Sequence, residues 1–188
     1  LLRLAEKNNS RFLFTSTSEV YGDPLVNPQP ETYLGNVSTT GPRSVYDEAK
    51  RFGERLVSYF VREKNIDARI ARIFNTYGPQ MHPKDMRMVE SFILSSLKNE
   101  PLNVFGDGTQ TRSLCYVSDT VDGLIRLMEH GDGNGEVVNI GSEEEHAVNK
   151  FAQMIIKLCN STSQISYTEK LPQDDSKKSR ADISKTRK

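Results

Sequence analysis

The chain alternates short apolar runs with longer segments in which apolar residues recur every three or four positions. We predict strands at 12–15, 68–74 and 137–140. The first of these carries three apolar residues in a row, FLF, which is typical of a strand buried on both faces. Strands of this kind belong to sheets that helices cover on each side.

Helical spacing fills the intervals between the predicted strands. The segment 44–64 places Ala49, Phe52, Leu56 and Phe60 on one apolar stripe, with charged residues on the other face. Further helices are predicted around 89–97, 121–128 and 148–159. The order of strands and helices predicts an α/β fold with parallel strands and right-handed crossovers.

The ends of the chain carry their own signals. LLRLA at 1–5 is interpreted as the second half of an amphipathic helix that leads into the first strand, so we expect the chain to begin inside a domain. The terminal run KKSRADISKTRK at 177–188 is basic, and we interpret it as a solvated or truncated end rather than a nucleic-acid tail.

The length and net charge of the chain limit the kinds of partner that we expect it to bind. The 188 residues suffice for one good core but not for two complete domains. Lys+Arg and Asp+Glu number 25 each, so the formal net charge is zero and neither nucleic acid nor an anionic membrane surface is expected as a partner. No apolar stretch approaches the roughly 18 residues of a membrane span. A small molecule is the expected ligand.

Cysteine and histidine usage points to a reduced compartment. Cys115 and Cys159 lie far apart, and the histidines His82, His130 and His146 are scattered. No metal-ligand spacing results, so we expect no structural metal and a cytoplasmic location.

Tyr46 and Lys50 form the first candidate for chemistry. Residues four apart on a helix share a face, so the Tyr46 hydroxyl and the Lys50 ammonium can point into one site. A fixed cation nearby stabilises a phenolate, the form in which tyrosine acts as a general base. Taken alone, the pattern is also that of an ordinary surface pair on an amphipathic helix.

The stretch TSTSEVYG at 15–22 adds hydroxyls at the end of the first predicted strand. The carboxyl end of a parallel strand borders the crevice where doubly wound sheets bind ligands. Thr17, Tyr46 and Lys50 are together the parts of a site that oxidises a hydroxyl. The set resembles the extended short-chain dehydrogenase/reductase family, which implies that Thr17 holds the substrate oxygen, Tyr46 takes its proton and Lys50 tunes the pair, with NAD as cofactor.

A longer series of motifs narrows the resemblance. TSTSEVYGDP, ETYLGNV, SVYDEAK, ARIFNTYGP, GTQTRSLCYVSD, GLIRLMEH and VNIG, in this order, resemble the UDP-glucuronate decarboxylases, also called UDP-xylose synthases. Weaker matches follow at LPQDD and ADISK. The resemblance implies a Rossmann-like doubly wound sheet with a smaller C-terminal α/β domain that binds the sugar nucleotide.

The resemblance also explains Ser18 and Glu19. Related dTDP-glucose 4,6-dehydratases read T-D-E-V-Y-G here, and their Asp and Glu eliminate water as acid and base. Ser18 stands at the Asp position, whereas Glu19 is kept. Decarboxylation needs no departing hydroxide, because oxidation at C4 of UDP-glucuronate makes a β-keto acid that loses CO2. Reduction of the 4-keto-pentose then yields UDP-xylose.

The remaining site residues follow from the same resemblance. Arg112 is expected on the UDP diphosphate, since a guanidinium grips phosphate with two hydrogen bonds, although it also reads as a surface arginine after a Gly-Asp-Gly turn. Arg180 either reaches the second phosphate or belongs to a solvated end, because the usual family arginine aligns with Ser179. The other expected substrate contacts are Ser18, Asn75, Val89, Phe92 and Phe105. Val89 and Phe92 can equally be interpreted as core residues. On the NAD side, Thr76 and Arg87 are expected in addition to Tyr46 and Lys50.

The glycine-rich NAD fingerprint of the family is not found in the 188 residues. We therefore expect the C-terminal part of such an enzyme, with 1–78 completing the NAD domain and 79–188 mainly binding the UDP-sugar, and little NAD binding or activity by this chain alone. Relatives form homodimers, and a dimer is expected here. Two alternatives stay open: another sugar-nucleotide 4,6-dehydratase or epimerase, and a catalytically silent binding or dimerisation module.

Overall fold

The computed structural model describes residues 1–85, 87–168 and 176–187. Its main sheet contains three parallel strands in the order β1-β2-β7, namely β1 (Phe12–Thr17), β2 (Ala68–Ile73) and β7 (Asn134–Ile140). The central strand is the most buried, because Ala68, Ile70 and Ala71 have no exposed surface. The α/β class and the parallel strands predicted from the sequence are confirmed.

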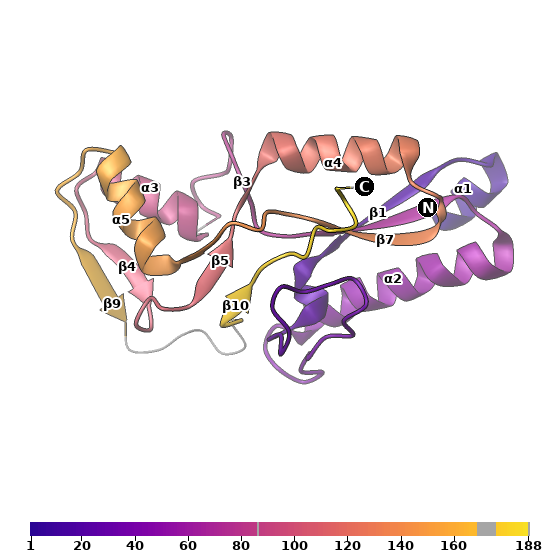
Figure 1. Ribbon diagram of the computed structural model, residues 1–188, viewed down its shortest axis with the longest axis horizontal. Helices are drawn as coiled ribbons and strands as arrows, with labels where there is room; N and C mark the ends of the chain where they lie inside the picture. Colours follow the sequence, from indigo (N-terminus) through magenta and orange to yellow (C-terminus); the bar gives the residue numbers. More distant parts are fainter. Residues whose placement is uncertain (86, 169–175, 188) are drawn as a thin grey trace.

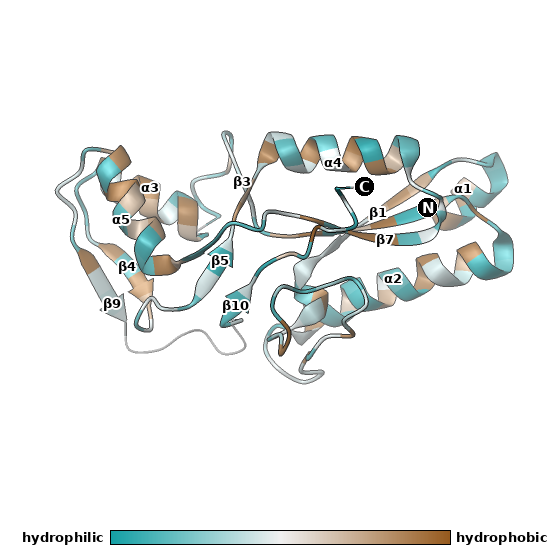
Figure 2. Cartoon of the chain, in the orientation of Figure 1, coloured by the Kyte–Doolittle hydropathy of each residue, from teal (hydrophilic) through white to brown (hydrophobic). Residues whose placement is uncertain are grey.

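Helices cover both faces of this sheet. The helix α2 (Ser44–Lys64) lies on one face with α1 (Leu2–Asn8) beside it, and α4 (Val117–His130) lies on the other (Figure 1). Both α2 and α4 alternate hydrophobic and hydrophilic segments along their length (Figure 2). The sheet is thus enclosed as a parallel sheet requires.

The face that α2 turns toward the sheet differs from the predicted stripe. Val57 is buried, with Phe60 and Val61 packed beside it, whereas Phe52 is 62% exposed and Leu56 37% exposed. The helix carries apolar residues on two faces, and only one of them can pack on the sheet. The prediction of the helix was correct, but the prediction that Phe52 and Leu56 belong to its core stripe was wrong.

A glycine sets the distance between α2 and β1. A Cβ atom at Gly53 would lie 2.3 Å from Cζ of Phe14, so any larger residue would push the helix away from the strand. Close approach of this kind is a recurrent use of glycine. It brings the N-terminal half of α2 against the end of β1.

The second lobe is smaller and has its own core. It contains α3 (Met88–Leu97), α5 (Val148–Leu158) and the parallel pair β4 (Leu102–Phe105) and β9 (Ile165–Thr168), which lie together at one end of the molecule (Figure 1). Its buried core is formed by Phe92, Leu102, Val104, Val148 and Ala152. The helices here were predicted; the strands were not.

Short strands connect the two lobes. They are β3 (Thr76–Tyr77), β5 (Thr111–Ser113), β6 (Cys115–Tyr116), β8 (Glu145–Ala147) and β10 (Lys178–Ser179), and the 3-10 helix η1 (Ser18–Tyr21) follows β1. The strand β5 pairs parallel to β10 and antiparallel to β8. Segments far apart in the sequence therefore meet beside β5.

The C-terminal segment packs back onto the first lobe at 179–183, so the predicted solvated end was wrong for these residues, whereas 184–187 are exposed. Ala181 is fully buried against Val20, Tyr21 and Phe74. The Thr186 hydroxyl donates to the carbonyl of Asn139 at 2.7 Å. The small side chain of Ala181 fits this buried space, which could not hold the lysines and arginines that neighbour it in the sequence. The LPQDD match lies outside the described residues.

Candidate active site

The hydroxyl-rich stretch lies at the carboxyl end of β1. The Thr17 hydroxyl accepts a hydrogen bond from the Glu19 backbone N–H at 3.3 Å, which caps η1. Thr17 and Ser18 are buried, at 8% and 7% exposure. The Glu19 carboxylate, in the first turn of η1, pairs with Arg43, which immediately precedes α2.

Tyr46 and Lys50 occupy one face of α2, as predicted. The Lys50 ammonium lies 5.8 Å from the centre of the Tyr46 ring and 5.4 Å from that of Phe14. It donates a hydrogen bond to the carbonyl of Thr15 at 2.8 Å. Tyr46 is 50% exposed. The helix therefore presents a phenol and a cation beside the end of β1, with the phenol open to a ligand.

A buried polar network supports this edge from beneath. The Ser16 hydroxyl donates to Oε1 of Glu54 at 2.6 Å, and Glu54 receives two hydrogen bonds from Arg72, at 2.9 and 2.7 Å. The Glu54 and Arg72 side chains are each 13% exposed. A two-pronged pair of this kind fixes both side chains in direction as well as distance.

The network continues from Arg72 to the far strand of the sheet. Arg72 donates to the Tyr21 hydroxyl at 2.9 Å, and Tyr21 donates to Oδ1 of Asn139 at 2.8 Å. Although burial alone would lower the pKa of Arg72, the hydrogen bonds with Glu54 raise it above its ordinary value. Burial raises the pKa of the Tyr21 phenol. Both groups therefore keep their protons at neutral pH, and the network holds TSTSEVYG at both of its ends.

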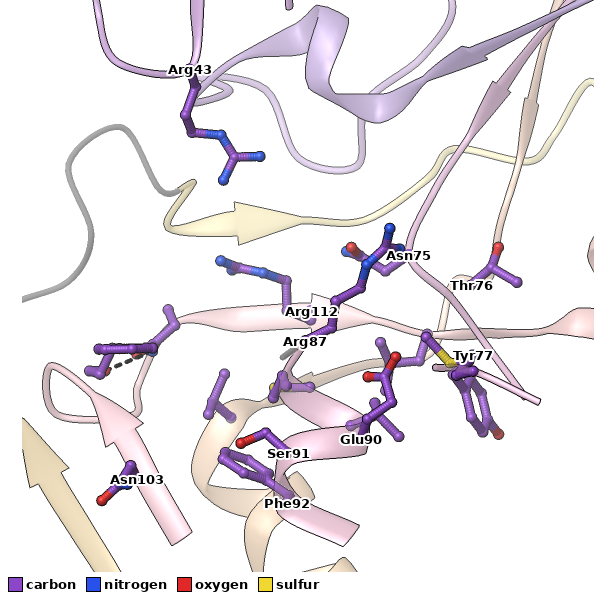
Figure 3. A pocket seen from close by; sticks show the side chains of 17 residues that line it. Arg43, Asn75, Thr76, Tyr77, Arg87, Glu90, Ser91, Phe92, Asn103 and Arg112 are labelled. Atoms are coloured by element: carbon purple, nitrogen blue, oxygen red, sulfur yellow. Dashed lines mark hydrogen bonds between the residues drawn. The ribbon is translucent and has the colours of Figure 1, made fainter. Parts of the chain in front are cut away.

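A pocket of about 360 Å³ opens between the two lobes. It is bounded by β3, α3, the end of β4 and β5, and Arg43 reaches it from the segment before α2 (Figure 3). Its lining combines arginines, amides and aromatic rings: Arg43, Asn75, Thr76, Tyr77, Met81, Arg87, Met88, Val89, Glu90, Ser91, Phe92, Asn103, Phe105, Gln110, Arg112, Leu114 and Val148.

The structure brings most of the predicted binding residues to this one pocket. Seven of them line it, from the substrate and the cofactor groups alike: Asn75, Thr76, Arg87, Val89, Phe92, Phe105 and Arg112. Phe92 is also part of the core of the second lobe, as its alternative interpretation predicted. The predicted catalytic residues Thr17, Glu19, Tyr46 and Lys50, and the predicted substrate contact Ser18, are not part of the lining. We refer to these five residues as the predicted catalytic edge. Arg43 links the two groups, because it lines the pocket and pairs with Glu19.

The arginines give the pocket its positive character. Arg112 lies on β5 and donates to the carbonyl of Thr111 at 2.8 Å, while Arg87 pairs with Asp85 at 3.2 Å. In Figure 3, Arg43 extends toward the pocket from one side and Arg87 and Arg112 from the other. Guanidinium groups in such an arrangement suit an anion with several oxygens.

Arg180 lies apart from this pocket. Its backbone N–H donates to Oε1 of Gln29 at 3.0 Å, and its carbonyl accepts from the Gln29 N–H at 2.9 Å. Arg180 is not among the residues that line the cavity. The backbone of Arg180 thus anchors the C-terminal segment to the loop after η1.

Polar pocket residues that the sequence reasoning did not assign to the site include Arg43, Glu90, Ser91, Asn103 and Gln110. Arg43 could have been noticed, since it stands three positions before Tyr46 in the motif-bearing segment. Glu90 had a weaker signal, an acid among the apolar positions of a predicted helix. Gln110 is 8% exposed, and its amide donates to the Phe105 carbonyl at 2.8 Å.

Residues 1–85, 87–168 and 176–187 were also considered for membrane spans, metal sites and reactive cysteines. No helix there has the length and apolar character to cross a bilayer, and no three His, Cys, Asp or Glu side chains gather as metal ligands. Cys115 and Cys159 carry free thiols. Burial raises the pKa of the Cys115 thiol, which disfavours the reactive thiolate.

Comparison with known proteins agrees with the motifs. A model described as "NAD dependent epimerase/dehydratase family" matches residues 1–141. UDP-glucuronic acid decarboxylase 3 of Arabidopsis thaliana is 51% identical over 187 residues, which are 100% of this chain and 54% of that protein. UDP-glucuronic acid decarboxylase 1 of Xenopus tropicalis is 44% identical, over 100% of this chain and 44% of its own length. The chain thus spans about half the length of the curated relatives it matches.

Solved structures show the same fold. UDP-glucose 4-epimerase from Thermotoga maritima, with UDP-glucose, superimposes with a TM-score of 0.90 at 30% identity, over 100% of this chain and 59% of that one. UDP-glucuronic acid 4-epimerase from Bacillus cereus, in complex with UDP-glucuronic acid and NAD, gives a TM-score of 0.87 at 31% identity, over 99% and 57%. The resemblance inferred from the motifs and the Rossmann-like fold are confirmed.

Proposed function

The chain belongs to the NAD dependent epimerase/dehydratase family, and on this premise we propose that it carries the catalytic edge and the nucleotide-sugar pocket of a UDP-glucuronate decarboxylase. The observation that carries the proposal is the junction at Arg43. This arginine pairs with Glu19 of the catalytic edge and lines the pocket that holds Arg112. A ligand whose diphosphate met Arg112 could extend its sugar toward Thr17 and Tyr46.

The donors at the catalytic edge fit the nicotinamide side of NAD. An ammonium group has three donors, and Lys50 uses one of them on the Thr15 carbonyl, so two remain for the hydroxyls of a ribose. Tyr46 stands half-exposed beside it. When bound there, NAD would supply the acceptor for the sugar's hydride and its later donor. Thr76 and Arg87 are proposed to face the cofactor as well, although both also line the substrate pocket.

Proton transfer falls to Tyr46. Tyr46, with the Lys50 ammonium beside its ring, takes the proton of the sugar C4 hydroxyl as general base and returns a proton to the C4 oxygen at the end. Thr17 holds that oxygen: its hydroxyl accepts from the Glu19 N–H and keeps its own proton to donate. The backbone hydrogen bond fixes the direction of the hydroxyl.

Ser18 and Glu19 favour loss of CO2 over loss of water. Once C4 is a ketone, the C5–C6 bond breaks, CO2 leaves, and the electron pair moves into the C5–C4 enolate. A proton that comes from solvent water then adds at C5 and gives the 4-keto-pentose. Ser18 lacks the carboxylic acid that would protonate a departing hydroxide, whereas Glu19, held by Arg43, remains at the edge of the site.

The pocket is proposed to hold the UDP part. Arg112 binds the diphosphate, Asn75 adds a contact, and Phe105, which is 51% exposed, stacks on the uracil ring. Val89 and Phe92 pack against the nucleotide. Ser18 is proposed to contact the sugar and Arg180 to contribute from the C-terminal segment, the latter more weakly because Arg180 does not line the pocket.

A homodimer is proposed from the outer face of α2. Val45, Phe52, Leu56 and Tyr59 recur on one side of this helix and are exposed by 83, 62, 37 and 43%. A row of large apolar side chains on a single helix is the kind of surface that a second copy covers. We further propose the division into 1–78 and 79–188, with β7 returning to the first lobe, and a cytoplasmic location.

One incubation tests the reaction. Full-length protein given UDP-glucuronate and NAD is expected to release CO2 and form a UDP-pentose, with no net consumption of NAD, as followed by mass spectrometry. With dTDP-glucose it is expected to give no 4-keto-6-deoxy product. Formation of that product, or of a UDP-hexuronate epimer in place of the pentose, would assign the chain to a dehydratase or an epimerase. Absence of turnover with bound substrate would support a silent binding module.

A further inference from the structure

Glu90 is the one acidic residue among those that line the pocket, and its carboxylate is without a partner. The residue lies in the first turn of α3 and is only 7% exposed. Neither Oε1 nor Oε2 accepts a hydrogen bond, although both atoms are fully buried. Figure 3 shows the side chain extending from α3 into the space that Arg87 also enters.

A buried carboxylate that receives no hydrogen bond is unfavourable. Nearly all buried polar groups in native proteins have a partner, so an unpaired carboxylate among pocket-lining residues calls for a hydrogen-bond donor. The N-terminus of α3 favours a negative charge in its first turn, but this effect is weak and supplies no hydrogen bond to either oxygen. No ion pair joins Glu90 to an arginine in the described part of the chain.

The position of Glu90 identifies the part of a nucleotide that it faces. In the view of Figure 3, its carboxylate lies below Arg87 on the side of the pocket where Tyr77 stands. Arg112, the predicted diphosphate contact, and Phe105, the predicted base contact, line the same pocket. A carboxylate next to a diphosphate would be repelled, so the group opposite it must offer hydrogen-bond donors. The ribose, which joins diphosphate to base, offers two neighbouring hydroxyls.

We propose that Glu90 accepts hydrogen bonds from the ribose hydroxyls of the bound nucleotide and so makes the pocket select ribonucleotides over 2′-deoxyribonucleotides. The inference rests on the proposed function in one respect, that the pocket holds a nucleoside diphosphate. Hydroxyl-to-carboxylate hydrogen bonds are short and strong, and a ligand lacking the hydroxyl leaves the carboxylate without a partner. Glu90 is thus a specificity-determining residue that separates UDP-sugars from dTDP-sugars.

Titration of full-length protein with UDP and with 2′-deoxy-UDP, in the presence of NAD, tests the inference. We expect the unsubstituted protein to bind UDP about tenfold to a hundredfold more tightly. Glu90→Ala should bring the two affinities within about threefold, and Glu90→Gln, whose amide oxygen still accepts, should keep part of the difference. UDP carries no second sugar, so the ratio reports on the ribose alone.

Glu100→Ala is the matched control, because Glu100 lies just after α3, is exposed and does not line the pocket. It should keep the ratio of the unsubstituted protein. Thermal unfolding without nucleotide should show that Glu90→Gln is at least as stable as the unsubstituted protein, since it removes a buried charge.

The outcomes separate the two proposals. If the unsubstituted protein binds no UDP, the proposed function fails and the inference fails with it. If UDP binds but its preference over 2′-deoxy-UDP is absent, or survives in Glu90→Ala, only the role of Glu90 is overturned. A large loss of stability in Glu90→Gln with an unchanged ratio would show a structural carboxylate and would overturn the role as well.

Discussion

Buried polar groups are paired in the network beneath the catalytic edge, whereas some in the wall of the pocket are unpaired. Beneath the edge, Ser16, Glu54, Arg72, Tyr21 and Asn139 are joined by hydrogen bonds of 2.6 to 2.9 Å. In the pocket wall, buried acceptors of two residues, Glu90 and Gln110, remain without donors. The hydrogen bonds of the first region are satisfied within the chain; for the second region we propose that a ligand supplies the missing donors.

The difference separates stability from recognition. Removing a member of the satisfied network leaves its partner buried and unpaired, so the fold should suffer. Removing an unpartnered group in the pocket should cost the fold little and change only what binds. Substitutions in the two regions can therefore test the distinction.

The largest effect is expected at Glu54. Glu54→Ala leaves the Arg72 guanidinium, 13% exposed, without its carboxylate, and loss of one partner of a buried pair costs about 3–5 kcal/mol of unfolding free energy. Urea denaturation measures it. The pocket substitution Glu90→Gln is the comparison and should cost nothing. Equal losses from the two variants would remove the distinction between the regions.

Tyr46→Phe tests whether catalysis can be lost while nucleotide binding in the pocket is kept. Loss of a positioned general base lowers kcat by at least about a hundredfold, whereas UDP binding should be retained because Tyr46 does not line the pocket. Steady-state kinetics on full-length protein and titration with UDP measure the two effects. Near-normal turnover in the variant would exclude Tyr46 as the base.

The two arginines test the pocket itself. Arg112→Ala should lose a charge-assisted hydrogen bond, about 1.5–3 kcal/mol or a tenfold or larger drop in UDP affinity. Arg180→Ala should lose less, because Arg180 contacts Gln29 through its backbone and does not line the cavity. Titration of both variants of full-length protein with UDP decides the order, and the reverse order would move the diphosphate to the C-terminal segment.

The smallest effect concerns the C-terminal segment that closes the network. Hydrogen bonds from Ser184 lower the pKa of the Asp182 carboxyl. A lowered pKa in the folded state stabilises the fold above the unfolded pKa, near 4, and this contribution is lost as pH falls through the folded pKa. Ser184→Ala should therefore be slightly less stable at neutral pH, with the difference shrinking in acid. A difference that grows in acid would contradict this.

The sequence predicted the elements with strong periodicity and missed those that depend on partners. The helix 44–64 and the three main strands follow from local patterns of apolar residues. Strands such as β5 and β10 are two or three residues long and exist because distant segments pair with them. The same limit explains the exposed Phe52 and Leu56, since spacing shows that a helix has an apolar face but not which of two faces meets the sheet.

The candidate site shows the same division. Tyr46 and Lys50 could be placed together from their spacing alone, and the structure places their side chains on one face of α2. Arg43 could have been noticed from its place three positions before Tyr46, but spacing could not show that Arg43 and Glu90 line one pocket, because that pocket joins segments from residue 43 to residue 148. Motif resemblance supplied Asn75, Phe105 and Arg112, but it did not supply residues outside the motifs.

A crystal structure of full-length protein with NAD and UDP-glucuronate tests the account most directly. The account predicts the diphosphate on Arg112 in the pocket between the lobes, with the sugar C4 hydroxyl within hydrogen-bond distance of both Tyr46 and Thr17. A nucleotide bound outside this pocket, or a C4 hydroxyl out of reach of Tyr46, would contradict it.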